Sequence, residues 1–219
     1  TVAIGGQYRK QKLDLRSNSD PAVPTDFTGL RGIPANRMTR FNNTNVGSAY
    51  GKLNVKEAFA EAQVPVFKSQ PFAEELSLNG AFRLTDYSTS GSVKTWKVGA
   101  VYKPIQDIMF RVTRSRDIRA PSLFELFAGV QTQPVNFNDP HTGQPGSIRQ
   151  FSGGNPDLDP ETGDTFAAGV VLSPSFLPGL DVSVDYYDLK IKGAIATQGL
   201  NDVINECETS NGTSPTCAL

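Results

Sequence analysis

The sequence predicts an all-β protein, an antiparallel up-and-down sheet of the kind that forms the wall of a transmembrane β-barrel. Apolar and polar residues alternate with a period of two over most of the chain, which is typical of strands with one apolar and one polar face. Two very long connections alternate with short ones. The longest apolar run, Phe166–Leu172, is much shorter than the roughly 20 residues of a membrane helix, whereas a barrel strand needs only about 9–11.

Seven strands are expected, and each shows this alternation. In segment 76–86, Leu76, Leu78 and Phe82 share one face, and serine, asparagine and arginine occupy the other. Faces of opposite polarity indicate that one side contacts an apolar environment and the other contacts water. The other expected strands are residues 2–9, 53–66, 94–103, 108–116, 163–172 and 181–192.

Lys56–Ala62 (KEAFAEA) is the ambiguous part of these strands. It consists of strong helix formers, so its local propensity slightly favours a helix. As a strand it places three alanines on one side and Glu57 and Glu61 on the other. The strands predicted around it favour the second interpretation.

The connections differ in length on the two sides of the sheet. Segments 10–52 and 117–162 are each longer than 40 residues and lie on the same side if the strands run up and down. The connections on the opposite side are short, with prolines near their boundaries. Short turns at one end and long loops at the other are the pattern of outer-membrane barrels. Within the second long segment, we expect Pro121–Phe127 to form one helical turn whose phenylalanines pack the loop.

Composition excludes several classes of function. Lys and Arg number 21 against 22 Asp and Glu, a net charge of −1, which does not favour a nucleic-acid binder. One histidine and two cysteines leave few ligands for a metal or haem site. The acidic residues show no paired, buried carboxylate pattern of a hydrolase. We therefore expect no enzyme, and no catalytic, cofactor-binding or metal site.

Cys207 and Cys217 lie close together in a polar stretch near the C-terminus. Their spacing suits a local disulfide loop, which would imply an oxidising compartment. Two unpaired surface thiols are the alternative.

Several motifs, in order, resemble the C-terminal half of the barrel of TonB-dependent outer-membrane receptors. They span roughly residues 50–219, and the cysteine pair resembles one that often follows the last of these strands. The motifs are Lys56–Val66 (KEAFAEAQVPV), Phe82–Tyr87 (FRLTDY), Arg116–Phe127 (RDIRAPSLFELF), Gly154–Glu161 (GNPDLDPE) and Leu172–Ile195 (LSPSFLPGLDVSVDYYDLKIKGAI).

The resemblance implies an importer in the bacterial outer membrane, with a barrel of about 22 strands closed by a plug. Such a receptor takes up a scarce nutrient (a siderophore, cobalamin or an oligosaccharide) and is energised by the periplasmic TonB complex. Residues 1–219 contain neither the plug nor the final strands, so we expect them to be part of a longer receptor barrel. A secreted carbohydrate-binding or adhesive β-domain is the alternative, and its apolar faces would meet a second sheet instead of lipid.

Arg114, Arg116 and Arg119, with Arg111 below them, are expected to form a cationic stripe at the outer end of a strand. The stripe would contact an anionic ligand or lipopolysaccharide phosphates through charge-assisted hydrogen bonds. Alternatively, these arginines pair with acidic groups on the lumen wall or the plug. The length of loops 10–52 and 117–162 suggests that they take part in capturing the nutrient.

Overall fold

The computed structural model describes residues 1–16, 23–39, 47–140 and 142–218. They form two compact units, of which the first comprises Thr1–Gln11, Leu53–Pro121 and Asp157–Ile195. The second comprises Lys12–Lys52, Ser122–Pro156 and Ala196–Leu219. The parts of loops 10–52 and 117–162 at residues 17–22, 40–46 and 141 lie outside the described residues.

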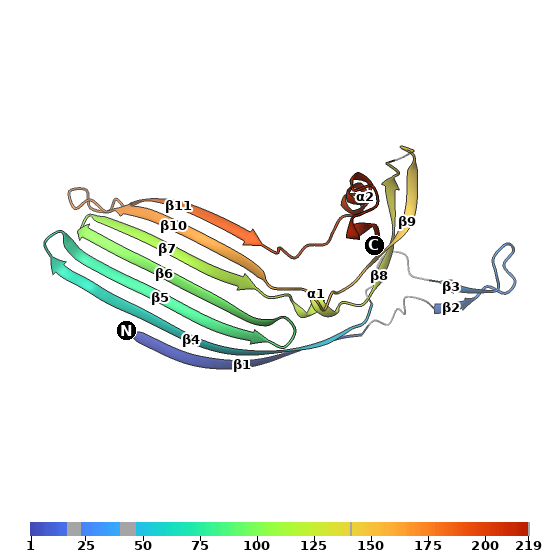
Figure 1. Cartoon of the computed structure of the whole chain (residues 1–219), viewed down its shortest axis with the longest axis horizontal. Helices are drawn as coiled ribbons and strands as arrows, with labels where there is room; N and C mark the ends of the chain where they lie inside the picture. The colour runs from blue at the N-terminus through green and yellow to red at the C-terminus, as the bar shows by residue number, and fades with distance from the viewer. Residues whose placement is uncertain (17–22, 40–46, 141, 219) are drawn as a thin grey trace. The chain divides into compact units, whose positions relative to one another are not determined.

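A seven-stranded sheet makes up most of the first unit (Figure 1). The seven expected strands are confirmed. Within this sheet β4, β5, β6, β7, β10 and β11 follow one another, and each pairs antiparallel with the next. Six of the seven are longer than predicted because pairing extends them past the alternating segments, and β11 begins one residue later than predicted. In spatial order they are β1 (Val2–Leu15), β4 (Ala49–Gln70), β5 (Ala73–Tyr87), β6 (Gly91–Ile105), β7 (Ile108–Arg119), β10 (Glu161–Leu172) and β11 (Val182–Lys192).

Lys56–Ala62 lies within strand β4. This agrees with the expectation from the surrounding strands and differs from the local helix propensity of the segment. Ala58 pairs with Leu84 and Ala60 with Phe82 of β5. The ladder of hydrogen bonds on both sides of β4 outweighs an intrinsic preference worth only tenths of a kcal/mol per residue. Tertiary pairing therefore determines the conformation of this segment.

One face of the large sheet is apolar and uncovered. Large side chains on it are exposed, among them Leu78, Phe82, Phe110, Val182 and Val184. Among the described residues of the first unit this is the only sheet, so that unit contains no second sheet to cover the face. A β-sandwich would bury these side chains between two sheets. The single open layer instead has the form of a barrel wall.

The second unit contains two hairpins and three short helical segments (Figure 1). The long connections are therefore not plain loops, although the sequence analysis found no strand in them. Prolines at positions 134 and 145 interrupt the alternation there. The elements are β2 (Val23–Asp26), β3 (Asn36–Thr39), α1 (Leu123–Phe127), β8 (Gln131–Asn138), β9 (Pro145–Ser152), α2 (Leu200–Thr209) and the 3-10 helix η1 (Pro215–Ala218). Every helix of the described residues is too short or too polar to cross a membrane.

Helix α1 confirms the expected helical turn, and a capping box begins it. The Ser122 hydroxyl accepts a hydrogen bond from the Glu125 N–H, and the Glu125 carboxylate accepts one from the Ser122 N–H. The expected packing is partly wrong: Leu126 is buried, whereas Phe124 is exposed. Phe127 does pack: its ring lies against Gly51, and a Cβ at position 51 would overlap it.

Candidate functional site

The polar face of the sheet carries a shallow hollow of about 390 Å³ lined by strands β4 to β7. The antiparallel register brings its residues together: Glu57 pairs with Thr85, Arg83 with Thr95, and Lys97 with Ser115. Because successive side chains of a strand alternate between faces, the polar positions of adjacent strands converge on one side.

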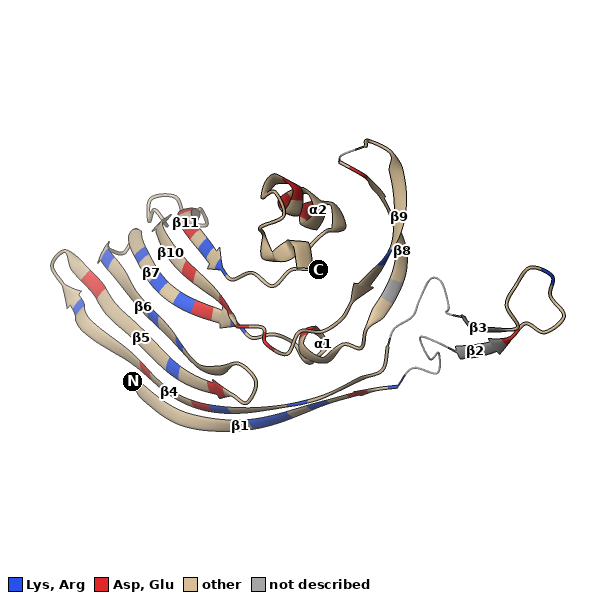
Figure 2. Cartoon of the chain, turned by 45° about the vertical axis from the view of Figure 1, so that its right-hand side comes forward, with Lys and Arg blue, Asp and Glu red and all other residues tan. Residues whose placement is uncertain are grey.

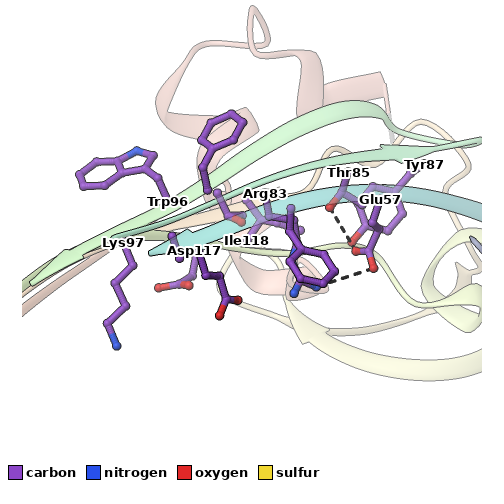
Figure 3. A pocket seen from close by; sticks show the side chains of 13 residues that line it. Glu57, Arg83, Thr85, Tyr87, Trp96, Lys97, Asp117 and Ile118 are labelled. Atoms are coloured by element: carbon purple, nitrogen blue, oxygen red, sulfur yellow. Dashed lines mark hydrogen bonds and ion pairs between the residues drawn. The ribbon is translucent and has the colours of Figure 1, made fainter. Parts of the chain in front are cut away.

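Glu57 is the centre of the interactions in this hollow (Figure 3). Its Oε1 accepts a hydrogen bond from the Thr85 hydroxyl at 3.1 Å, and its Oε2 lies 3.7 Å from Nη1 of Arg83. The Glu57 side chain is only 7% exposed, and a buried carboxylate needs partners that compensate its charge. Thr85 and Arg83 provide this compensation. The Arg83 guanidinium also lies over the Phe59 ring, 5.1 Å from its centroid.

Lys97 and Asp117 add further charges to the lining. Figure 3 shows the Lys97 side chain on the opposite side of the sheet from Trp96, as expected for adjacent residues of one strand. The hollow thus presents carboxylates, an ammonium group and a guanidinium to one space. It can hold a polar or charged group through charge-assisted hydrogen bonds.

Strands β7, β10 and β11 are joined by three bidentate arginine–carboxylate pairs, and Figure 2 shows the basic positions on β7. Arg116 donates to both oxygens of Asp164 at 2.7 and 2.9 Å, and Arg119 donates to Glu161 at 2.9 and 2.8 Å. Both pairs join residues that lie directly opposite in the register of β7 and β10. Each arginine side chain is more than 40% exposed, so solvent screens both pairs and each contributes little to stability.

The third pair crosses an intervening strand. Arg111 of β7 donates to Asp185 of β11 at 2.9 and 2.6 Å, over Gly169 of β10. A Cβ on Gly169 would lie within 2.8 Å of the Asp185 carboxyl carbon and closer still to its Oδ1. The absence of a side chain at position 169 therefore allows this ion pair to form.

The expected cationic stripe is wrong as a single surface. Arg111 and Arg119 lie on the polar face of β7, and Arg114 and Arg116 lie on its apolar face, because positions an odd number apart alternate. The alternative, pairing with carboxylates of the lumen wall, describes Arg111 and Arg119, whereas Arg116 pairs with Asp164 on the apolar face. Arg114 forms no ion pair with any described residue. Contact of Arg114, Arg116 and Arg119 with a ligand or lipopolysaccharide stays a prediction.

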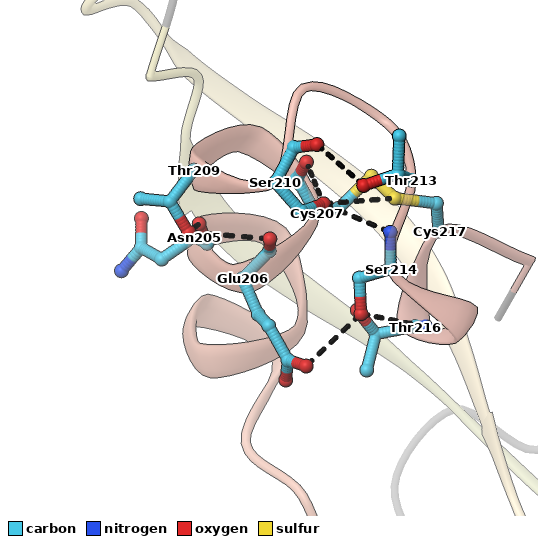
Figure 4. The surroundings of a disulfide bond; sticks show 9 residues. All are labelled: Asn205, Glu206, Cys207, Thr209, Ser210, Thr213, Ser214, Thr216 and Cys217. Carbon is cyan, nitrogen blue, oxygen red and sulfur yellow. Dashed lines mark hydrogen bonds between the residues drawn. A yellow bond between two sulfur atoms is a disulfide. The ribbon is translucent and has the colours of Figure 1, made fainter.

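Cys207 of α2 and Cys217 of η1 form a disulfide with a Cα–Cα distance of 4.9 Å (Figure 4). Side-chain hydroxyls reinforce the turn between them: Ser210 donates to the Cys207 carbonyl, and Ser214 donates to the Glu206 carboxylate. The bond and these contacts fix the end of the second unit to α2.

Asp26 closes a small turn after strand β2. Its Oδ1 accepts hydrogen bonds from both the hydroxyl and the N–H of Thr28. These bonds favour the ionised carboxylate and lower the pKa of Asp26 from its ordinary value, the Thr28 hydroxyl being the larger cause.

In the residues that the structure describes, no group of three His, Cys, Asp or Glu side chains is placed to hold a metal ion. The hollow around Glu57 was not identified from the sequence. The alternation does place Glu57, Arg83 and Lys97 on the polar faces of their strands. Their convergence depends on the register, which one sequence does not contain.

Comparison with known proteins agrees with the fold. Residues 1–216 match the family model described as TonB dependent receptor-like, beta-barrel. No curated protein sequence gives a significant match.

Solved structures with a similar fold include the siderophore receptor PirA from Acinetobacter baumannii, with a TM-score of 0.60 at 15% identity. A variant of the ferric enterobactin receptor PfeA from Pseudomonas aeruginosa, in complex with enterobactin, has a TM-score of 0.59 at 16% identity. Each match covers 87% of this chain but 24% of the receptor. The chain thus spans about a quarter of the length of these receptors, and at such identities the likeness shows the fold.

Proposed function

Because this chain belongs to the TonB-dependent receptor β-barrel family, we propose that it is part of a receptor in the bacterial outer membrane. The receptor imports a scarce nutrient, which is a siderophore, cobalamin or an oligosaccharide. Import is driven by the TonB energy-transducing complex acting through a plug domain of the same protein. The barrel wall binds and guides the nutrient and catalyses no reaction.

The exposed apolar face of the large sheet is the observation that carries this proposal. Phe82, Phe110 and Val184 are exposed on one face of the sheet. In water, each Å² of apolar surface left uncovered would make the folded sheet less stable by roughly 25 cal/mol. Lipid on that side removes the cost. The opposite face, with its ion pairs around Glu57 and Arg111, suits a hydrated lumen.

The edges of the sheet support a longer barrel. Strands β1 and β11 each have one neighbour within the sheet. In a membrane, an unpaired strand edge leaves backbone N–H and C=O groups without hydrogen bonds, and each costs several kcal/mol. We propose that further strands of the receptor pair with both edges and that its plug faces the polar side.

The second unit, which interrupts and follows the strands, is assigned to nutrient capture. Its described elements are the hairpins β2–β3 and β8–β9 and the disulfide-bonded helix α2. In the proposed receptor these segments lie at the outer face. Binding residues commonly lie on such connections, because the rigid strands hold the connections in place while the sequence of the connections can change.

The test uses the intact receptor in its own cells. Uptake of three labelled nutrients, a ferric siderophore, cobalamin and an oligosaccharide, is compared between wild type, a deletion of the receptor and a strain lacking TonB. We expect the receptor in the outer-membrane fraction and a loss of uptake for one nutrient class in both mutants. Deletion of β8–β9 and, separately, of β2–β3 should weaken binding of that nutrient at the cell surface.

A receptor found in the soluble fraction would refute the membrane assignment. Unchanged uptake of all three nutrients after deletion of the receptor would refute the import function. Unchanged nutrient binding in both hairpin deletions would refute the capture role of the second unit alone.

A further inference from the structure

A second hollow, of about 380 Å³, lies between the β8–β9 hairpin and helix α2. All of its lining residues belong to the second unit, and its volume falls in the range of about 300–1,000 Å³ that is typical of small-ligand sites. The described residues that line it are polar or apolar, and none is charged. Those that carry the argument are Asn136, Asn138 and Pro145 of the hairpin and Asn201, Ile204 and Asn205 of α2.

The register of the hairpin determines its side of the hollow. Asn138 lies directly opposite Pro145, and Asn136 lies on the same face of β8, because the side chains of a strand alternate with a period of two. The turn between the two strands is closed by a backbone hydrogen bond, in which the Asp139 N–H donates to the Gln144 carbonyl at 2.9 Å. The two asparagines are therefore held on a paired and closed hairpin.

Helix α2 forms the other side of the hollow. Asn201, Ile204 and Asn205 are three and four residues apart, so they share one face of the helix. Figure 4 shows the Asn205 side chain directed away from the disulfide. The disulfide, together with the hydrogen bond from Ser214 to the Glu206 carboxylate at 2.9 Å, ties this helix to the chain that follows it. Both sides of the hollow are thus formed in advance, which lowers the entropic cost of binding a ligand.

The four asparagine side chains of the lining are available to a ligand. All four are exposed, and none forms a side-chain hydrogen bond with another described residue. Each amide supplies two N–H donors and one carbonyl acceptor. A hydroxyl group both donates and accepts, so it pairs with either end of an amide. Pro145 and Ile204 add small apolar surfaces, which suit the C–H face of a sugar ring.

Charged residues border the hollow without lining it. Asp139 and Asp202 each follow a lining asparagine in the sequence, and Glu208 lies on the lining face of α2. Arg149 lies on the lining face of the hairpin. These bordering charges are mostly acidic and disfavour an anionic ligand, whereas a cationic ligand would meet no carboxylate in the described lining. The chemistry of the hollow therefore favours a neutral ligand.

We propose that this hollow binds a neutral oligosaccharide, which makes that class the nutrient of the receptor. Its hydroxyl groups bond to the four amides, and a sugar ring lies against Ile204 and Pro145. An anionic ferric siderophore would meet no cation in the described lining, and the corrin ring system of cobalamin is too large for a hollow of about 380 Å³. The inference rests on the proposed function, because it takes the second unit to be the part that captures the nutrient.

The experiment measures ligand binding by the purified intact receptor in detergent. The probes are an array of neutral oligosaccharides of glucose, galactose, mannose and N-acetylglucosamine, a matching array of sulfated and sialylated oligosaccharides, and ferric enterobactin. Isothermal titration then gives the Kd of each probe that binds. The test variant is Asn136→Leu with Asn205→Leu, which removes one amide from each side of the hollow at nearly constant side-chain size.

The matched control variant is Gln133→Leu with Gln150→Leu. These two glutamines lie directly opposite each other in the same hairpin, and Gln133 donates to Gln150 at 3.4 Å. Gln133 is an odd number of residues from Asn136, so the pair occupies the opposite face of the hairpin, and neither glutamine lines the hollow. The control therefore removes two amides from the same part of the molecule and leaves the hollow intact.

We expect at least one neutral oligosaccharide to bind. The asparagine variant should weaken its binding about 10- to 100-fold, because both lost amides take their hydrogen bonds to sugar hydroxyls with them. The glutamine variant should bind it like the wild type. Asn205→Leu alone should show part of the loss, and leucine is a better helix former than asparagine, so α2 is kept. Gel mobility of each unheated variant, compared with the wild type, reports whether the barrel folds.

The inference would be overturned if no neutral oligosaccharide bound, if the asparagine variant bound it unchanged, or if the glutamine variant lost as much. Ferric enterobactin binding that the asparagine variant weakens would overturn it as well. In all these cases the import function stands as long as deletion of the receptor abolishes uptake of a siderophore or cobalamin. Oligosaccharide binding through these asparagines, with no uptake that depends on the receptor and TonB, would instead refute the import function and leave the site standing.

Discussion

Gly154 is a position where we expect a single added methyl group to have a large local effect. Its N–H donates to the Ala128 carbonyl at 2.9 Å, and the N–H of Asn155 donates to the Glu125 carbonyl at 2.9 Å. These two bonds hold the segment before β10 against helix α1. In Gly154→Ala, the Cβ would lie 2.5 Å from the Ala128 nitrogen and 2.7 Å from the carbonyl carbon and oxygen of Leu126.

The magnitude follows from the atoms that must move. All three are backbone atoms of the turn that ends α1, so no flexible side chain can move aside. Overpacking costs about 1–3 kcal/mol, and the two backbone bonds contribute about 1 kcal/mol each. We therefore expect local opening to become easier by about 2–4 kcal/mol. That change raises hydrogen exchange of the protected amides about 30- to 700-fold.

The assay is hydrogen exchange with mass spectrometry on the intact receptor, following peptides that contain residues 154 and 155. Gly153→Ala is the matched control, because its nearest contacts are at 3.5 Å, an ordinary van der Waals distance. Neither glycine has a positive φ, so alanine strains neither backbone. Equal exchange in Gly154→Ala and Gly153→Ala would show that α1 is not held in this way.

Three further outcomes are expected. Gly169→Ala should separate Arg111 from Asp185. Arg111→Gln should therefore lower the free energy of unfolding in the wild type and change it almost not at all when alanine stands at 169; equal losses in the two backgrounds would refute this. Thr28→Val should raise the pKa of Asp26 measured by NMR. The hydrogen bond from the Thr28 hydroxyl to the Asp26 carboxylate stabilises the fold above pH 3.8, and this stabilisation is lost as the pH falls through the lowered pKa of Asp26 in the folded state. An unchanged titration of Asp26 in Thr28→Val would contradict this. Replacing both cysteines by serine should speed proteolysis between α2 and η1, and unchanged cleavage would argue against a constraining disulfide.

The strands of this chain were predictable because their signal is local. In residues 76–86 and 108–116, neighbouring positions alternate in polarity, and a strand turns successive side chains to opposite faces. The turn at Pro121–Phe127 was also predictable, since Ser122 and Glu125 have the spacing of a capping box. Lys56–Ala62 marks the limit of local information, because its composition and its pairing favour different structures.

The positions of side chains relative to other strands were not predictable in the same way. The arginines of β7 are close together in sequence, yet the pleat sends Arg114 and Arg119 to opposite faces. Arg111 and Asp185 are 74 residues apart and meet only because β10 lies between their strands with a glycine at the crossing. The hairpin β8–β9 was missed because its prolines break the alternation.

The sequence by itself therefore determined the class of fold, the number of strands in the large sheet and the polarity of each strand. These follow from periodicity, which is a property of neighbouring residues. Only the tertiary structure decided which charges pair, where the hollow around Glu57 forms, and which carboxylates lie opposite Arg116 and Arg119 of β7. Those depend on register, because a shift of one residue between two strands would move every side chain to a different partner and face.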